Sequence, residues 1–437
     1  MEKALLVGLQ LGHEKRWSVE DSLEELGQLA DTAGAQVVDA VIQRRAHRDP
    51  AFLIGTGKAK QIGELCRRWG VDLVIFNDDL SPTQVQHLEE TLSARVIDRT
   101  GLILDIFAKR ARTSEGKLQV ELAQLRYLLP RLLGKGKVLS QLAGGIGTRG
   151  PGETQLELDR RKIRRRINKL EADLMRVRKT RALHRERRRT VSIPTVAIVG
   201  YTNAGKSTLL NALTRADVLV EDKLFATLDP IVKKLRLPSK HEILVSDTVG
   251  FIQRLPHQLV AAFKATLEEV VEADLLLHII DISHPQVDSQ RTSVQKVLME
   301  LGAEKKPQLE VYNKVDILAD PTIRNRWAEN QGNGVLISAL YGDGIQELVS
   351  HIDTVLFPLK ERWHLRIPVE RGDLLAILYQ SCKIASRNDD ERSIVLEAEM
   401  PMRLAASFIP FRITGSAGSR PIAEKKSGPR RLFEKVG

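Results

Sequence analysis

The sequence predicts a multidomain α/β protein. Its expected parts are an N-terminal α/β domain (1–112), an antiparallel helical hairpin (113–192), a parallel-rich sheet with flanking helices (193–358), a small α+β C-terminal domain (359–413) and a disordered tail (414–437). Alternating strand and helix patterns predict the first domain, and a complete phosphate-binding loop after an apolar run predicts the third. With 437 residues and 42% hydrophobic content, the chain can form several packed cores.

The first 112 residues alternate short apolar runs with segments of helical periodicity. The expected strands cover residues 4–9, 36–42 and 71–76, and the expected helices lie near residues 18–33, 57–69 and 82–93. Gly55, Gly57 and Lys58 suggest a second phosphate loop, but Phe52 stands where that motif needs its first glycine. We interpret this stretch as a turn that starts a helix, with an adenine-nucleotide site of another design as the alternative.

Residues 113–192 contain two segments whose apolar residues recur mostly at alternating spacings of three and four. They are Leu118, Leu122, Leu125, Leu129 and Leu132 in the first segment, and Leu156, Ile163, Ile167, Leu170, Leu174 and Val177 in the second. The spacing predicts paired helices over about 114–133 and 154–189, with Pro130 kinking or shortening the first. Residues 160–189 carry 15 Lys or Arg against 3 Asp or Glu, a net charge of +12 in a chain of +11.

The loop expected between these helices, residues 134–152, has seven glycines, three basic residues and no acidic one. Small side chains and exposed N–H groups suit close approach to a folded RNA, whose phosphates accept hydrogen bonds from Lys and Arg. The alternative is a solvated helix face with a flexible connector, although such helices normally mix charges of both signs. An anionic membrane surface is disfavoured because the seam lacks anchoring Trp and Phe.

Residues 200–207 read G-x-x-x-x-G-K-S and directly follow the apolar run 196–199, as in a nucleotide-binding phosphate loop. Backbone N–H groups would contact phosphate oxygens at the positive end of the next helix. Lys206 would neutralise the β and γ phosphates, and Ser207 would offer Mg²⁺ a ligand. The residues expected to bind nucleotide are Gly200, Tyr201, Thr202, Asn203, Ala204, Gly205, Lys206, Ser207 and Thr208. The alternative is an unrelated Gly-rich turn.

Further polar residues follow apolar runs in the order that a guanine-nucleotide domain needs. Asp247 would hold a Mg²⁺-bound water, and the N–H of Gly250 would contact the γ-phosphate. Thr227 is the expected switch threonine, which joins Mg²⁺ only when the γ-phosphate is present. Lys206, Thr227 and Gly250 are the expected catalytic residues, and Ser207 and Thr227 the expected Mg²⁺ ligands.

The base site is predicted at residues 309–316 and 335–339. Asp316 can accept from the N1–H and 2-amino groups of guanine, whereas adenine would leave this acid unpaired, and such unpaired groups give selectivity on the order of 10⁴. Asn313, Lys314, Ser338 and Ala339 complete the expected site, with backbone N–H groups of the last two facing guanine O6. The expected ligands are therefore GTP and GDP, with Mg²⁺.

Two residues of this domain bear on mechanism. Phe251 follows Gly250, where many small GTPases carry a glutamine that orients the attacking water. Either Phe251 packs in a core and another group substitutes, or intrinsic hydrolysis is slow and a partner completes the site; we favour the second. Asn203 resembles the asparagine of potassium-activated GTPases and would then hold K⁺, but it equally suits a turn with unusual backbone angles.

Composition limits the cellular setting. Cys66 and Cys382 are too few and too far apart for a disulfide framework or a metal knuckle, which fits a reducing cytosol. The apolar start is too short for a signal peptide, and no run approaches the ~18 apolar residues of a membrane span. We expect a soluble cytoplasmic monomer that does not insert into membranes, with peripheral membrane association left open.

Taken together, residues 150–161, the phosphate loop, residues 225–230, residues 247–251 and residues 313–316 resemble the HflX family of translational GTPases over nearly the whole chain, fading after about Leu356. The resemblance implies a GTPase that binds the large ribosomal subunit and its rRNA. It also implies that the Gly-rich loop reaches toward the peptidyl-transferase region and that the factor splits stalled or idle ribosomes.

Two other classes remain open from the residues alone. A ribosome assembly GTPase would bind precursor subunits instead of 70S particles. A nucleotide-gated RNA-binding module with negligible turnover would bind GTP without ribosome-stimulated phosphate release, and Phe251 makes this class plausible.

Overall fold

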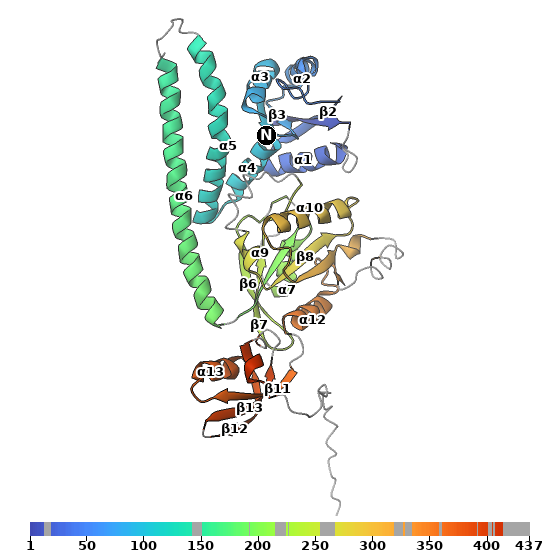
Figure 1. Cartoon of the computed structure of the whole chain (residues 1–437). Helices are drawn as coiled ribbons and strands as arrows, with labels where there is room; N and C mark the ends of the chain where they lie inside the picture. Colours follow the sequence, from blue (N-terminus) through green and yellow to red (C-terminus); the bar gives the residue numbers. More distant parts are fainter. Residues whose placement is uncertain are drawn as a thin grey trace, which may run out of the picture. The chain divides into compact units, whose positions relative to one another are not determined.

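The chain is a multidomain α/β protein, as predicted (Figure 1). The computed structural model describes residues 1–12, 19–141, 151–191, 193–214, 224–225, 227–253, 267–318, 327, 334–357, 361–390, 392–400, 404 and 407–413. The chain forms two compact units, Met1–Ile352 and Asp353–Gly437, whereas the sequence placed a domain boundary at residue 358. Within these described ranges, no helix is both long and apolar enough to cross a membrane.

The N-terminal domain is a four-stranded parallel sheet in the order β2-β1-β3-β4. Its strands are β1 (Lys3–Leu11), β2 (Gln36–Arg45), β3 (Leu73–Phe76) and β4 (Arg95–Asp98), and its helices are α1 (Val19–Ala33), α2 (Thr56–Trp69), α3 (Pro82–Leu92) and α4 (Arg99–Arg110). Helix α2 begins directly after Gly55, in agreement with the helix-start interpretation. The sequence analysis missed β4, whose four residues include only two apolar ones, and also missed α4.

The helical hairpin consists of α5 (Ser114–Gln141) and α6 (Pro151–Val191). Its apolar seam is closed by the buried residues Leu122, Ile167, Leu170 and Leu174. Helix α5 continues through Pro130, so residues 134–141 are helical and not part of the loop as predicted. A proline removes one backbone hydrogen bond, a loss that the seam packing of the residues before Pro130 can offset. The rest of the predicted loop, residues 142–150, lies outside the described residues.

Helix α6 begins three residues earlier than predicted, at Pro151. Proline suits the first turn of a helix because its missing N–H would have no partner there and its φ is already helical. Figure 1 shows α5 and α6 side by side along most of their length. The two helices therefore form one antiparallel unit of the predicted kind.

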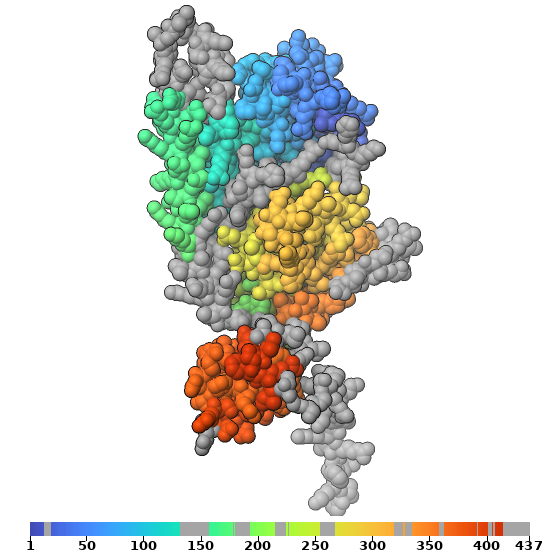
Figure 2. Space-filling model, viewed as in Figure 1, coloured from blue at the N-terminus to red at the C-terminus, as the bar shows by residue number. Residues whose placement is uncertain are grey.

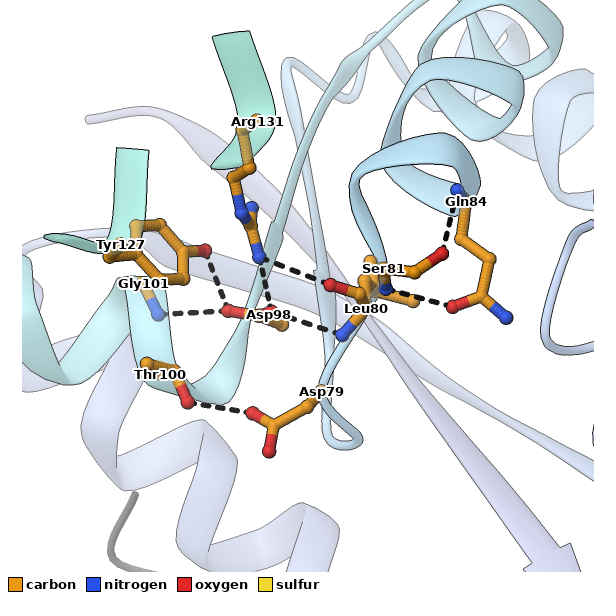
Figure 3. A network of polar contacts seen from close by, with 9 residues as sticks. All are labelled: Asp79, Leu80, Ser81, Gln84, Asp98, Thr100, Gly101, Tyr127 and Arg131. Carbon is orange, nitrogen blue, oxygen red and sulfur yellow. Dashed lines mark hydrogen bonds and ion pairs between the residues drawn. The ribbon is translucent and has the colours of Figure 1, made fainter. Parts of the chain in front are cut away.

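Buried Asp98 ties α5 to the N-terminal sheet (Figure 3). It caps α4 by accepting from the Gly101 N–H at 2.9 Å, and it also accepts from the Leu80 N–H at 3.1 Å. From α5, the Tyr127 hydroxyl donates to Asp98 at 2.7 Å, and Arg131 forms an ion pair with it. One carboxylate thus joins β4, α4 and the middle of α5.

The central domain is a six-stranded sheet in the order β10-β9-β8-β5-β7-β6. Its strands are β5 (Thr195–Gly200), β6 (Ile231–Arg236), β7 (Glu242–Asp247), β8 (Leu275–Asp281), β9 (Gln308–Asn313) and β10 (Val335–Leu336). Its helices are α7 (Lys206–Thr214), α9 (Glu268–Glu272), α10 (Val287–Glu300), η1 (Val315–Ile317) and α12 (Ile345–Leu356). Among the described strands of this central sheet, only β6 runs antiparallel to its neighbour, so the carboxyl ends of the other five strands meet at one edge.

The C-terminal unit contains a small antiparallel sheet in the order β11-β13-β12. Its elements are β11 (Glu361–Pro368), α13 (Gly372–Ser381), β12 (Lys383–Asp389), β13 (Ser393–Met400) and η2 (Ile409–Phe411). Its core is built on Trp363, Leu365, Leu378, Leu396 and Phe408. The predicted α+β character is therefore present, whereas the tail predicted at 414–437 lies outside the described residues.

Replacing Asp98 with alanine tests the link between α5 and the sheet. We expect Asp98→Ala to lower the free energy of unfolding of this region by about 3–5 kcal/mol, because the partly buried Arg131 loses its counter-charge. Hydrogen exchange of the α4 and α5 amides measures the change. Asp105→Ala, which removes an exposed acid from the same helix α4, is the control. Equal exchange in the two variants would contradict the assigned role of Asp98.

Candidate nucleotide site

The phosphate loop connects β5 to α7, and Lys206 opens α7. Its side chain is buried, and the ammonium donates to the Tyr201 carbonyl at 2.6 Å. Burial lowers the pKa of Lys206 to about 8, and the nearby Asp247 carboxylate partly offsets that effect. A desolvated ammonium gains strongly from an anion that joins it, so phosphate binding is favoured here.

Three oxygen-bearing side chains converge beside Lys206. Ser207 donates from Oγ to Asp247 Oδ2 at 2.6 Å, Thr227 donates to the same oxygen at 3.0 Å, and the two hydroxyls lie 2.8 Å apart. Burial raises the pKa of Asp247, while Lys206 lowers it. Asp247 Oδ1 is buried with no hydrogen-bond partner among the described residues. Hard oxygen donors of this kind, one of them unsatisfied, fit Mg²⁺.

The segment after β7 lies directly against the phosphate loop. The Thr202 N–H donates to the Phe251 carbonyl at 2.7 Å, and the Phe251 N–H donates to the Gly200 carbonyl at 3.0 Å. A side chain at Gly250 would begin 2.9 Å from both the Lys206 ammonium and the Thr202 Cα, so this close approach requires glycine. Phe251 is buried in the core, as in the interpretation that the sequence analysis did not favour, and this burial does not show which group positions the attacking water.

Asn203 has a left-handed backbone, with φ of 59°. Asparagine tolerates this conformation better than most residues. Its side chain is exposed. The geometry therefore supports the turn-forming interpretation of Asn203 directly.

Asn313 joins the phosphate loop to the predicted base loop. Its Nδ2 donates to the Ala204 carbonyl at 2.8 Å, and its Oδ1 accepts from the Ala339 N–H at 2.9 Å. The Ser338 N–H donates to the Asp343 carbonyl at 3.0 Å. Both N–H groups expected to face guanine O6 thus have partners within the chain. The Ala339 N–H can donate to guanine O6 only if it makes a bifurcated hydrogen bond or gives up its bond to Asn313.

Lys314 and Asp316 lie just beyond β9. Lys314 has φ of 67°, and its ammonium lies 2.7 Å from Asp281 Oδ2 at the end of β8. Asp316 lies in η1 and is exposed. An exposed carboxylate can accept hydrogen bonds from a base, which is compatible with the predicted role of Asp316.

Sequence reasoning missed a second set of residues around the phosphate loop. The Tyr201 hydroxyl donates to Glu25 of α1 and accepts from the Gln253 N–H at 2.8 Å, while Glu25 also pairs with buried Arg99. A cavity of about 320 Å³ lies between α1 and the phosphate loop. Tyr201 and Glu25 are 176 residues apart, so no local pattern could have found this contact.

Three known protein families match successive parts of the chain. Residues 20–108 match the N-terminal region of a GTP-binding GTPase, and residues 110–188 match the middle region of such a GTPase. Residues 195–314 match a family described as a 50S ribosome-binding GTPase. All three matches fall within the first compact unit.

Individual relatives extend the match to nearly the full length. GTPase HflX of Caldanaerobacter subterraneus is 50% identical over 94% of each chain, and that of Escherichia coli is 45% identical over 92% of this chain and 94% of its own. A GTP-binding protein of Sulfolobus solfataricus, solved with GDP, is 25% identical with a TM-score of 0.44. It covers 81% of this chain and 98% of its own.

Asn313 offers a test of loop support. We expect Asn313→Ala to weaken GTP and GDP binding about equally, by roughly 10–100-fold, because two buried backbone groups lose partners that hold both loops. Equilibrium titration with each nucleotide measures this. Asn168→Ala, at an exposed position of α6, is the control. A loss confined to GTP would assign Asn313 to the γ-phosphate and contradict the supporting role.

Proposed function

Because the chain belongs to the HflX family of GTPases, we propose that it binds the large ribosomal subunit and splits stalled or idle 70S ribosomes, with hydrolysis stimulated by the ribosome. The observation that carries this proposal is a basic helical hairpin that lies in the same compact unit as the candidate nucleotide site and is joined to the segment of Thr227 through Asp229. The description of the family matched by residues 195–314 supports large-subunit binding.

The exposed face of α6 supports a nucleic-acid partner. Ile167, Leu170 and Leu174 face the seam, whereas Arg164, Arg165, Lys169 and Lys179 are exposed. The described part of α6, green in Figure 2, lies open on the visible surface. Exposed cations on one helix face suit the phosphates of rRNA.

Arg166 differs from its basic neighbours. Its guanidinium makes two contacts with Glu121 of α5, at 2.6 and 2.8 Å. This ion pair bridges the two helices at the surface, so the Arg166 guanidinium already has a carboxylate partner within the hairpin. An RNA-binding test therefore needs other residues.

Ser207 and Thr227 would ligate Mg²⁺, with Asp247 holding a coordinated water. The ion, when bound, would neutralise charge on the phosphates. Lys206 would hold the β and γ phosphates, and the Gly250 N–H would contact the γ-phosphate. Asn203 would hold K⁺ if its side chain turns toward the phosphates.

Phe251 cannot orient a water molecule, because its phenyl ring has no hydrogen-bonding group. We expect the ribosome to supply the missing catalytic help. Completion of a GTPase site by a partner raises rates by about 10³–10⁵-fold. Hydrolysis would then occur only on the large subunit, and it would release the protein from that subunit after the ribosome has been split.

Hydrolysis by the purified protein tests this function. In K⁺ buffer we expect large subunits to raise GTP turnover on the order of 10³-fold or more, with no effect on ATP. Lys206→Ala should abolish it, and Na⁺ should slow it if Asn203 holds K⁺. Equal rates with and without subunits would favour the binding-module alternative. Stimulation by precursor subunits but not by mature ones would favour an assembly factor.

Neutralising the exposed face of α6 tests the RNA surface. We expect a variant combining Arg164→Gln, Arg165→Gln and Lys169→Gln to bind large subunits more weakly and to flatten the slope of log affinity against log salt by about two to three. Sedimentation binding at several salt concentrations measures both quantities. Arg166→Gln, which breaks the Glu121 pair, is the comparison. Unchanged binding by the triple variant would contradict the assignment of this face of α6 to RNA binding.

A further inference from the structure

Asp229 lies two residues after the switch threonine Thr227 and contacts the start of α5. Its Oδ2 accepts from the backbone N–H groups of Arg112 and Thr113, each at 2.9 Å. Its Oδ1 accepts from the Thr113 hydroxyl at 2.5 Å. One carboxylate therefore receives three hydrogen bonds from a segment more than a hundred residues away in the sequence.

The residues at the start of α5 are arranged around this contact. The Thr113 hydroxyl, while donating to Asp229, accepts from the Gly116 N–H at 2.9 Å and so caps the helix. A side chain at Gly116 would begin 2.4 Å from Asp229 Oδ1, so the carboxylate fits only against glycine. A negative charge at a helix N-terminus is also favoured by the helix dipole.

Apolar contacts hold the same segment on both sides of Thr227. Phe225 packs edge-on against Phe107 of α4, with ring centroids 4.7 Å apart. Leu228 is buried in the same core as Val120 of α5. The segment that carries Thr227 thus packs against α4 and α5, while Thr227 itself contacts Ser207 and Asp247 of the nucleotide site.

We propose that Asp229 is a positioning residue for the GTPase reaction, and that it links Thr227 to the first turn of α5. Thr227 contacts Ser207 and Asp247, so its place depends on what occupies the nucleotide site. Only Leu228 separates it from Asp229, so a shift of Thr227 moves the carboxylate that holds Thr113, the capping residue of α5. The γ-phosphate and the hairpin would thereby bias one shared element, which is the requirement for coupling between two sites.

The link works in both directions. By thermodynamic reciprocity, a hairpin held on RNA favours the position of Asp229 that places Thr227 at the nucleotide. This effect on docking rests on the proposed large-subunit binding, whereas the connection between Thr227 and α5 is a property of the isolated chain. The two parts can therefore fail separately.

Hydrogen exchange in the full-length protein tests the intramolecular part. The Gly116 and Lys117 amides donate to Thr113, so their exchange reports on the cap. In the wild type we expect a non-hydrolysable GTP analogue to slow their exchange roughly tenfold relative to GDP. Asp229→Asn should abolish this difference, because an amide cannot accept all three bonds. Glu242→Gln, which removes an exposed acid from β7, should keep it.

Variants of Thr113 separate a link from simple stabilisation. Thr113→Ser retains the hydroxyl and should keep the nucleotide-dependent difference, whereas Thr113→Val should lose it. Asp229→Asn should also lower kcat roughly tenfold and leave KM for GTP nearly unchanged. No nucleotide dependence in the wild type, or dependence that survives in Asp229→Asn, would overturn the proposal. Exchange coupling without subunit-stimulated hydrolysis would uphold the link and count against the proposed function.

Discussion

The nucleotide site depends on one geometric constraint, which is that the parallel strands of the central sheet end at the same edge. Asp247 ends β7, Asn313 ends β9 and Gly200 ends β5, so residues far apart in sequence meet there. Asn313 fixes the arrangement by bonding Ala204 on one side and Ala339 on the other. A site held in this way presents its phosphate-binding groups in place before the nucleotide arrives.

Helix α5 connects the nucleotide site to the N-terminal sheet, in addition to the contact of Tyr201 with Glu25 of α1. Asp98 holds its middle against the N-terminal sheet, and Asp229 holds its first turn against the segment of Thr227. Its other face packs on α6, which carries the excess positive charge. A helix that is held at two points, and that itself supports the basic surface, is suited to pass a small displacement from one domain to another.

The sequence predicted the fold class well because its signals were local. The phosphate loop is contiguous, and the leucine spacing of α5 and α6 defines a seam regardless of context. It failed where packing decides the outcome, as when α5 continues through Pro130. For Ala339, the predicted backbone donor was present, but its partner is Asn313. The contacts of Glu25 and Asp229 join distant segments through single side chains, which leave no periodic pattern to detect.

For the proposed splitting of ribosomes, we propose that the γ-phosphate orders the segment of Thr227, and that the protein in this conformation binds the large subunit and excludes the small one. Sedimentation of purified 70S ribosomes with the full-length protein tests it most directly, with a non-hydrolysable GTP analogue compared with GDP. With the analogue we expect free 30S and 50S particles and the protein on the 50S fraction, and with GDP we expect intact 70S particles. Intact 70S particles with both nucleotides, or equal splitting with both, would contradict it.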